Sequence, residues 1–207
     1  MTHPAPAAFV ESMIDANGVR IRCRAAGDGE TLVVLHGPQE PAPSGALGLI
    51  AASRRVVAIE VPQGDATTAA AAIAALGSAR HALWGHGAAA GLALSVAMAQ
   101  PETVEAVVLV APAALDDLAA RDDTFVPRLK DLATPALALF GTEDRIAPCE
   151  SAHRYRTAMT NCSVVMVYDA GHAIDTDRPE AVASVVDDFL ARHEGFLVRR
   201  TSGLIHP

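Results

Sequence analysis

The chain has 207 residues, of which 51% are hydrophobic, and its formal net charge is −8 at pH 7. This length predicts a single domain over residues 1–207, with a flexible start at 1–8 and a tail at 195–207. The acidic balance, with no basic cluster against it, argues against nucleic acid and anionic membrane as partners.

Cysteine usage and the N-terminal residues bear on the cellular compartment. Cys23, Cys149 and Cys162 are widely spaced and form no metal-ligand pattern, so we expect no metal site and no cofactor. The N-terminal residues lack a basic segment followed by an apolar run, and no apolar run is long enough to span a bilayer. These features predict a cytoplasmic protein. The many alanines, and Lys130 as the one lysine, favour a bacterial source.

Strand-like and helix-like segments alternate along the chain after an N-terminal hairpin. This alternation predicts an α/β fold with a mostly parallel sheet. The strand segments are short runs of Val, Ile and Leu without strict alternation, which is typical of strands buried on both faces. The predicted strands are 11–16, 20–26, 31–35, 56–61, 81–84, 106–110, 135–140 and 163–167. The predicted helices are 46–53, 67–76, 88–99, 150–159 and 179–193.

Local signals mark several of the predicted ends. Asn17-Gly18 predicts the tight turn of the first hairpin. Gly77 suits the C-terminal end of an alanine-rich helix. Asp177 is predicted to cap the last helix, with Pro179 in its first turn.

A glycine-rich turn is the most informative motif. A strand ending at Trp84 is followed by Gly85-His86-Gly87-Ala88-Ala89 and then by a helix of small residues. This layout resembles the G-x-S-x-G nucleophile elbow, in which a strained turn presents a serine at the top of an α/β sheet. Gly87 stands at the nucleophile position. Because glycine has no side chain, it cannot attack a carbonyl carbon.

Five further segments stand in the order found in one family, and with them the chain resembles the α/β-hydrolase superfamily over nearly its whole length. They are the hairpin 15–22, the strand 32–37 that ends in His-Gly, the strand 104–112, the strand and turn 137–144, and the loop 169–172. The resemblance implies the α/β-hydrolase fold: a mostly parallel eight-stranded sheet with an N-terminal antiparallel hairpin, and helices on both faces.

The family commonly inserts a helical cap after the strand that ends near Val110. Here the corresponding stretch, 112–134, has room for one helix or two small ones. We therefore predict no cap domain, and a site that is open or covered by another subunit.

The resemblance also implies the catalytic positions. Gly87, Asp144 and His172 follow the family's chain order of nucleophile, acid and histidine, so Asp144 corresponds to the acid and His172 to the base. We expect these two side chains to be hydrogen-bonded, with the imidazole facing Gly87. The alternatives are a turn or capping aspartate and a loop histidine with local contacts. His86, at the x of the motif, is interpreted as a structural support of the elbow.

The same resemblance indicates a defect in the oxyanion hole. One donor is the backbone N–H of Ala88, which is retained. The other commonly comes from the residue after His-Gly, and here Gly37 is followed by Pro38, which has no backbone N–H. Losing one such donor costs about a hundredfold or more in rate. The side-chain amide of Gln39 is a possible replacement.

Three other side chains are alternative nucleophiles, and each also has an ordinary structural interpretation. Ser44 suits a loop or a helix cap. Ser95 lies two turns into the helix after the elbow and is expected to pack. Cys149, near a helix start, follows the acid loop, where the family places no chemistry.

Three functional hypotheses follow. The chain is a pseudohydrolase that binds a small, partly apolar ligand or acts as a subunit, with homo-oligomers possible. Alternatively, it is an enzyme of altered chemistry that uses His172 as a general base. In the third, it is an ester or thioester hydrolase inactivated by an engineered Gly87. Pro38 argues against the third, because an inactivating substitution needs no second defect.

Overall fold

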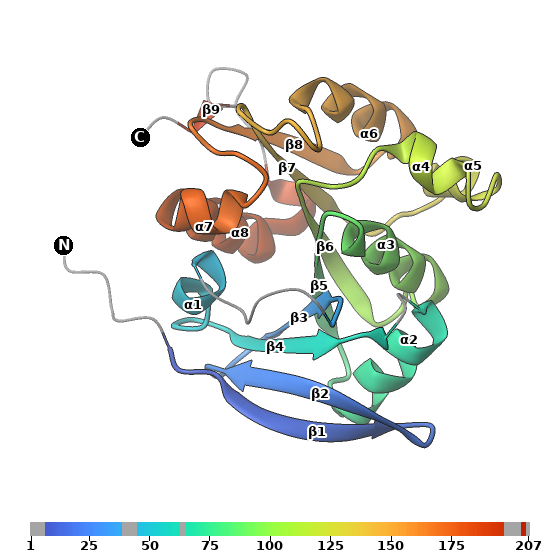
Figure 1. The fold of residues 1–207 in the computed structure, drawn as a ribbon, viewed down its shortest axis with the longest axis vertical. Helices are drawn as coiled ribbons and strands as arrows, with labels where there is room; N and C mark the ends of the chain where they lie inside the picture. The colour runs from blue at the N-terminus through green and yellow to red at the C-terminus, as the bar shows by residue number, and fades with distance from the viewer. Residues whose placement is uncertain (1–6, 39–44, 63–64, 197–203, 206–207) are drawn as a thin grey trace.

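The computed structural model describes residues 7–38, 45–62, 65–196 and 204–205. Its strands form a nine-stranded sheet in the order β1-β2-β4-β3-β5-β6-β7-β8-β9 (Figure 1). They are β1 (Val10–Ala16), β2 (Val19–Ala26), β3 (Thr31–His36), β4 (Arg55–Glu60), β5 (His81–His86), β6 (Val104–Val110), β7 (Ala136–Gly141), β8 (Cys162–Val167) and β9 (Leu204–Ile205).

The sheet is parallel except at its N-terminal side. β2 pairs antiparallel with both β1 and β4, and every other neighbouring pair is parallel. Asn17 and Gly18 have φ values of 56° and 84°, the left-handed conformation that a two-residue hairpin turn requires. The predicted α/β-hydrolase fold, with its hairpin and its parallel sheet, is therefore confirmed.

Helices cover both faces of the sheet, as predicted (Figure 1). One face carries α2 (Ala66–Ala75), α3 (Ala89–Ala99), α4 (Leu115–Ala119), α5 (Phe125–Leu129) and α6 (Ala152–Ala158). The other face carries α1 (Ala46–Ile50), α7 (Ile174–Asp177) and α8 (Pro179–Arg192).

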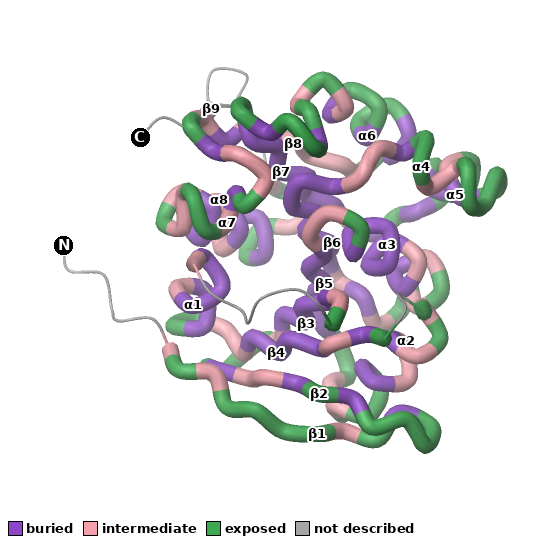
Figure 2. The backbone as a smooth tube through the Cα atoms, in the orientation of Figure 1, coloured by how far each residue is buried: buried purple, intermediate pink, exposed green. Residues whose placement is uncertain are grey.

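The two faces have separate apolar cores. In β3, Val33 and Leu35 pack under α2 and α3, whereas Leu32 and Val34 pack under α1 and α8. The central strands are buried on both sides, and β1 is exposed at the edge (Figure 2). Burial of each Val or Leu side chain stabilises the folded state by roughly 1.5–3 kcal/mol. Strands covered on both faces are therefore apolar along their whole length.

Several local predictions need correction. Leu204–Ile205, in the predicted tail, forms a ninth strand beside β8, which sequence analysis did not predict. Asp177 does not cap α8, because no side-chain hydrogen bond caps that helix. A 3₁₀ turn at Cys149–Ser151 precedes α6, so the regular helix starts later than predicted. The predicted start at 1–8 is described only at residues 7 and 8, and the tail only at 195–196 and 204–205.

The strand order creates a crevice at the carboxyl edge of the sheet. From β3 the chain crosses through α1 to β4 on one side, and from β5 it crosses through α3 to β6 on the other. The loops that follow β3 and β5 therefore diverge. In open parallel sheets, ligands bind at such a switch point.

Within the described residues, no helix is long and apolar enough to cross a membrane.

We expect one buried histidine to reduce stability in acid. His81, at the start of β5, is 2% exposed, and neither ring nitrogen has a hydrogen-bond partner within the described part of the chain. Burial lowers the pKa of His81 from 6.5, and the charge of Glu105 partly opposes this shift. The unfolded state therefore binds more protons between 6.5 and the lowered pKa, and stability falls as the pH falls through that window.

His81→Leu is expected to abolish this acid-induced loss of stability. The loss amounts to about 1.4 kcal/mol for each pH unit by which folding lowers the pKa of His81. Urea denaturation at neutral and mildly acidic pH measures it. The exposed His153→Leu serves as the control and should lose as much stability in acid as the wild type. An equal acid-induced loss in His81→Leu would contradict the assignment.

Candidate functional site

The turn between β5 and α3 is fixed by backbone contacts. The Gly87 N–H donates to the Val110 carbonyl at 2.9 Å, at the end of the neighbouring strand β6. Gly87 has φ of +53°, a conformation that glycine adopts without strain. A Cβ on Gly85 would lie 2.4 Å from the Ala89 carbonyl oxygen, so the turn is too tight for any other residue there.

Asp144 lies in the turn after β7, and its side chain is fully buried. One carboxylate oxygen accepts the Ile146 and Ala147 N–H groups at 2.7 and 2.9 Å. The other lies 2.9 Å from Nδ1 of His172. Asp144 is therefore both the turn aspartate and the partner of His172, two interpretations that sequence analysis had treated as alternatives.

The electrostatics of Asp144 favour its charged form. Burial by itself raises the pKa of this carboxyl group, but the hydrogen bonds from Ala147, His172 and Ile146 outweigh burial and lower the pKa below 3.8. The stabilisation is present above pH 3.8 and is lost as the pH falls through the lowered value. A charged carboxylate only accepts hydrogen bonds, so Nδ1 of His172 carries the proton toward Asp144.

The loop that carries His172 is held from three sides. The Gly171 N–H donates to the Asp177 carboxylate at 2.8 Å, which explains why Asp177 does not cap α8. The Glu143 N–H donates to the Ala170 carbonyl at 2.9 Å. His86 Nε2 lies 2.9 Å from the His172 carbonyl oxygen and donates to it. His86 therefore supports the histidine loop, whereas the sequence analysis predicted that it supports the elbow.

The imidazole of His172 faces Gly87, as predicted. A Cβ built on Gly87 lies 3.6 Å from Nε2 and 4.0 Å from Cε1 of His172, an ordinary contact distance. Apart from Gly87 and its chain neighbours His86 and Ala88, no other atom of the described residues comes within 4 Å of that position. Because Nδ1 donates to Asp144, Nε2 of the neutral ring presents its lone pair to the space where a side chain at position 87 would stand.

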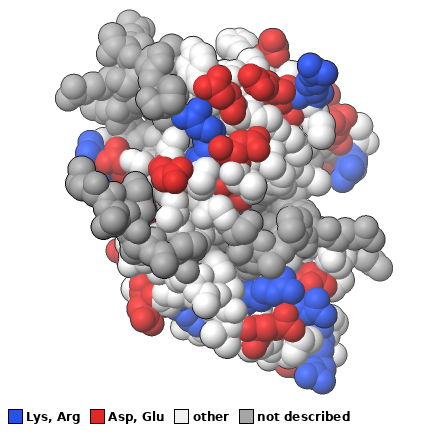
Figure 3. All heavy atoms as spheres, turned by 60° about the vertical axis from the view of Figure 1, so that its left-hand side comes forward, with Lys and Arg blue, Asp and Glu red and all other residues white. Residues whose placement is uncertain are grey.

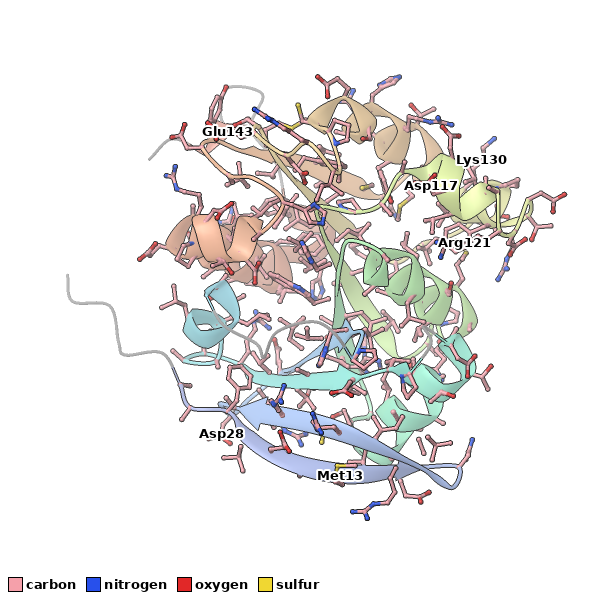
Figure 4. All side chains as sticks on the ribbon, viewed as in Figure 1. Met13, Asp28, Asp117, Arg121, Lys130 and Glu143 are labelled. Carbon is pink, nitrogen blue, oxygen red and sulfur yellow. The ribbon has the colours of Figure 1, made fainter. Side chains whose placement is uncertain are left out.

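A cavity of about 500 Å³ adjoins this turn. It lies at the ends of β3 and β5, at the switch point of the sheet. The α4–α5 segment forms its far wall, and Figure 4 labels Arg121 where this segment faces α3. The lining residues are His36, Gly37, Pro38, Val61, Ala88, Ala89, Gly91, Leu92, Ser95, Leu118, Arg121, Asp122 and Phe125.

The predicted binding residues Gly37, Pro38 and Ala88 all line this cavity. The Ala88 N–H has no acceptor among the described residues, as an unused oxyanion donor would require. Pro38 lies in the same lining and offers no N–H. Gln39, the predicted replacement donor, lies outside the described residues, and so does Ser44.

The other alternative nucleophiles are engaged elsewhere. Ser95 lines the cavity, but its hydroxyl donates to the Gly91 carbonyl at 2.9 Å. Cys149 packs against the core between the sheet and α6 and does not line the cavity. Neither side chain is hydrogen-bonded to His172.

Some contributors to the site were not predicted. Leu118, Arg121 and Phe125 complete the cavity, and their only sequence signal was the shortness of the stretch 112–134. Asp175, on α7, has a pKa raised by burial, which the nearby charge of His86 partly offsets. Its sequence environment gave no sign of burial.

No metal site is found in the described ranges, since no three His, Cys, Asp or Glu residues there are arranged to hold an ion. On the face drawn in Figure 3, acidic and basic side chains are interspersed.

Comparison with known proteins finds similarity over parts of the chain. Residues 117–194 match the family model described as TAP-like protein, a stretch that contains Asp144 and His172 and begins after Gly87. A segment of 63 residues is 33% identical to the uncharacterized hydrolase YugF of Bacillus subtilis (strain 168). That segment spans 30% of this chain and 23% of the relative. In these segments the chain is similar to proteins of the α/β-hydrolase superfamily.

Solved structures agree on the fold. A predicted CIB-like hydrolase from Thermoplasma acidophilum superposes with a TM-score of 0.72 at 21% identity, covering 89% of this chain and 98% of that one. A putative lipase from Acinetobacter baumannii AYE gives a TM-score of 0.77 at 14% identity, covering 90% and 92%. At these identities the likeness establishes the α/β-hydrolase fold alone.

Removing the charge of Asp144 should reverse the tautomer of His172. In Asp144→Asn, an amide N–H facing Nδ1 would make that nitrogen the acceptor and move the proton to Nε2. Loss of the charge-assisted bond is expected to lower the free energy of unfolding by about 1–3 kcal/mol. Nitrogen chemical shifts of the imidazole by NMR distinguish the tautomers.

Asp169→Asn is the matched control, because Asp169 is exposed and pairs with Arg178 rather than with His172. Its imidazole shifts should equal those of the wild type. Wild-type shifts in Asp144→Asn would mean that the contact between Asp144 and His172 does not orient the ring in solution.

Proposed function

We propose that this α/β-hydrolase-fold chain is a pseudohydrolase, which binds a small, partly apolar ligand and forms no acyl-enzyme. The observation that carries the proposal is Gly87, which faces Nε2 of His172 at the position of the family's nucleophile. Acyl transfer by this family's mechanism needs an oxygen nucleophile there, whose proton the histidine accepts. Gly87 supplies no such atom.

The oxyanion hole supports the same proposal. An efficient hydrolase stabilises the tetrahedral oxyanion with two preorganised donors. Ala88 offers an unused N–H in the cavity, whereas Pro38, in the same lining, has none. The two departures affect different steps, attack and charge stabilisation. Together they disfavour serine-type catalysis more strongly than either does alone.

The cavity supports a binding role. Its volume of about 500 Å³ falls in the range of small-molecule sites. Its lining combines apolar side chains, chiefly Leu92, Leu118 and Phe125, with the polar side chains of Ser95, Arg121 and Asp122. A ligand with an apolar portion and one polar end matches this distribution.

A second candidate function is general-base catalysis by His172 on a bound water or a substrate proton. The observation that favours it is the retained hydrogen bond of 2.9 Å between His172 Nδ1 and Asp144, which leaves Nε2 as the acceptor. Any such turnover would be lost in His172→Ala and would leave no covalent intermediate.

Activated esters provide the direct test. With p-nitrophenyl acetate we expect no burst, and with a fluorophosphonate probe no labelled serine, because no activated oxygen nucleophile is present at position 87. Mass spectrometry of the intact protein measures the labelling. Stoichiometric labelling at any serine would overturn the proposal, and labelling at Ser44 would identify a relocated nucleophile.

Gly87→Ser alone is expected to give no robust esterase activity. The hydroxyl would have room beside His172, but a side chain at φ of +53° adds strain on the order of 1–3 kcal/mol, and the donor missing at Pro38 would still be absent. Initial rates on p-nitrophenyl butyrate measure the outcome. The informative comparison is Gly87→Ser combined with Pro38→Ala, which restores an N–H and should be more active by about a hundredfold.

Robust turnover by Gly87→Ser alone would contradict the pseudohydrolase proposal. It would favour the hypothesis that Gly87 replaces a serine in an otherwise intact enzyme.

A further inference from the structure

Two cavities adjoin at the wall that the α4–α5 segment forms. The first is the cavity of about 500 Å³ described above. The second has a volume of about 250 Å³ and is lined by Ala88, Ala113, Asp117, Leu118, Ala120 and Arg121. Three residues, Ala88, Leu118 and Arg121, line both cavities. His172 lines neither of them, so this wall is a different part of the crevice from the histidine loop.

Arg121 is the one lysine or arginine among the described residues that line the two cavities. Its side chain is exposed and takes part in no ion pair or hydrogen bond within the described chain. By contrast, Arg128 on the same segment and Arg154 on α6 pair with Asp122 and Asp116. A guanidinium is always charged and presents five N–H donors. Arg121 is therefore a cation at the cavity wall whose donors are available to a ligand.

The acidic neighbours of Arg121 differ in how far their carboxylates are engaged. Asp122 also lines the first cavity, but one of its oxygens accepts the Thr124 N–H at 2.9 Å and the Thr124 hydroxyl at 2.7 Å. These bonds lower the pKa of Asp122 and keep its carboxylate in the turn. Asp117 lines the second cavity four residues before Arg121, without an ion pair between them (Figure 4). Asp117 is thus the side chain that competes with a ligand for Arg121.

The rest of the larger cavity suits an apolar body. Leu92 projects from α3, and Leu118 and Phe125 belong to the α4–α5 segment on the opposite wall. Contact with these side chains removes apolar ligand surface from water. The chain as a whole has a net charge of −8 and repels anions over its surface, so retaining an anion here requires a specific cation.

We propose that Arg121 determines the ligand specificity of this cavity, by binding an anionic group that is attached to an apolar, ring-sized body. The anionic group lies at the α4–α5 wall, and the apolar body packs between that wall and α3. This inference rests on the proposed binding function and names its ligand class. No covalent bond forms or breaks.

Two fluorescent probes that differ by one anionic group test the proposal. Anilinonaphthalene sulfonate carries a sulfonate, and N-phenylnaphthylamine has the same rings without it. We expect one sulfonate probe to bind per chain, with an affinity at least about tenfold lower in Arg121→Gln, because the variant loses a charge-assisted contact. The affinity for N-phenylnaphthylamine should be equal in the variant and the wild type. Fluorescence titration measures both affinities.

Arg156→Gln is the matched control. Arg156 lies on α6, is exposed, has no ion pair in the described chain and lines neither cavity. Its substitution makes the same change in net charge, and the affinity for the sulfonate probe should stay at the wild-type value. Thermal unfolding confirms that the variants are folded.

Asp117→Asn is expected to act in the opposite direction. Removing the competing carboxylate should strengthen binding of the sulfonate probe by about twofold, the worth of an exposed pair one helical turn apart. Tighter binding would support competition between Asp117 and the ligand for Arg121. Weaker binding would contradict it.

The position of the probe is checked by NMR. Intermolecular NOEs are expected between the aromatic protons of the sulfonate probe and the methyl groups of Leu92 and Leu118, which line the cavity. Probe protons that show NOEs only to residues outside the cavity would overturn the proposal, because the sulfonate would then be bound elsewhere.

The remaining outcomes separate this inference from the proposed function. Wild-type affinity for the sulfonate probe in Arg121→Gln, an equal loss in Arg156→Gln, or no binding of this probe overturns the role of Arg121. Binding of N-phenylnaphthylamine without a preference for the sulfonate overturns the ligand class and leaves the proposed binding function in place. Fluorophosphonate labelling of a serine overturns the pseudohydrolase proposal whatever the two probes do.

Discussion

The parallel direction of β3, β5, β7 and β8 is the constraint on which the candidate site depends. Parallel strands end at one edge of the sheet, so the loops after these strands meet there although they are far apart in sequence. The apolar runs that form the strands are buried on both faces, which holds the strands inside the sheet. The positions of Gly87, Asp144 and His172 are therefore set by the packing of the sheet.

At this edge of the sheet, several hydrogen bonds together fix the positions of Asp144 and His172. A buried carboxylate is costly unless its oxygens are hydrogen-bonded, and here two backbone N–H groups and the imidazole satisfy them. His86 supports the histidine loop from the elbow side. An oriented imidazole thus stands opposite a residue with no side chain. This combination of an oriented imidazole and a missing nucleophile underlies the proposed function.

The short α4–α5 segment shapes the site without forming a cap domain. Its apolar side chains close one side of a cavity whose other sides are the strand ends and α3. Gly91 on α3 lets this segment approach closely, since a Cβ there would lie 2.7 Å from a Leu118 methyl group.

The sequence by itself determined the fold and the order of the site residues, because short sequence patterns indicate both. Apolar runs gave the strands, Asn17-Gly18 gave the hairpin, and the glycine turn at 85–87 gave the elbow that lacks a serine. Only the tertiary structure decided which side chains meet. His86 contacts a carbonyl 86 residues away, Asp177 binds Gly171 instead of capping its own helix, and Leu204–Ile205 adds a strand beside β8. These contacts depend on how loops that are distant in the sequence pack against one another, and a local sequence pattern carries no information about that packing.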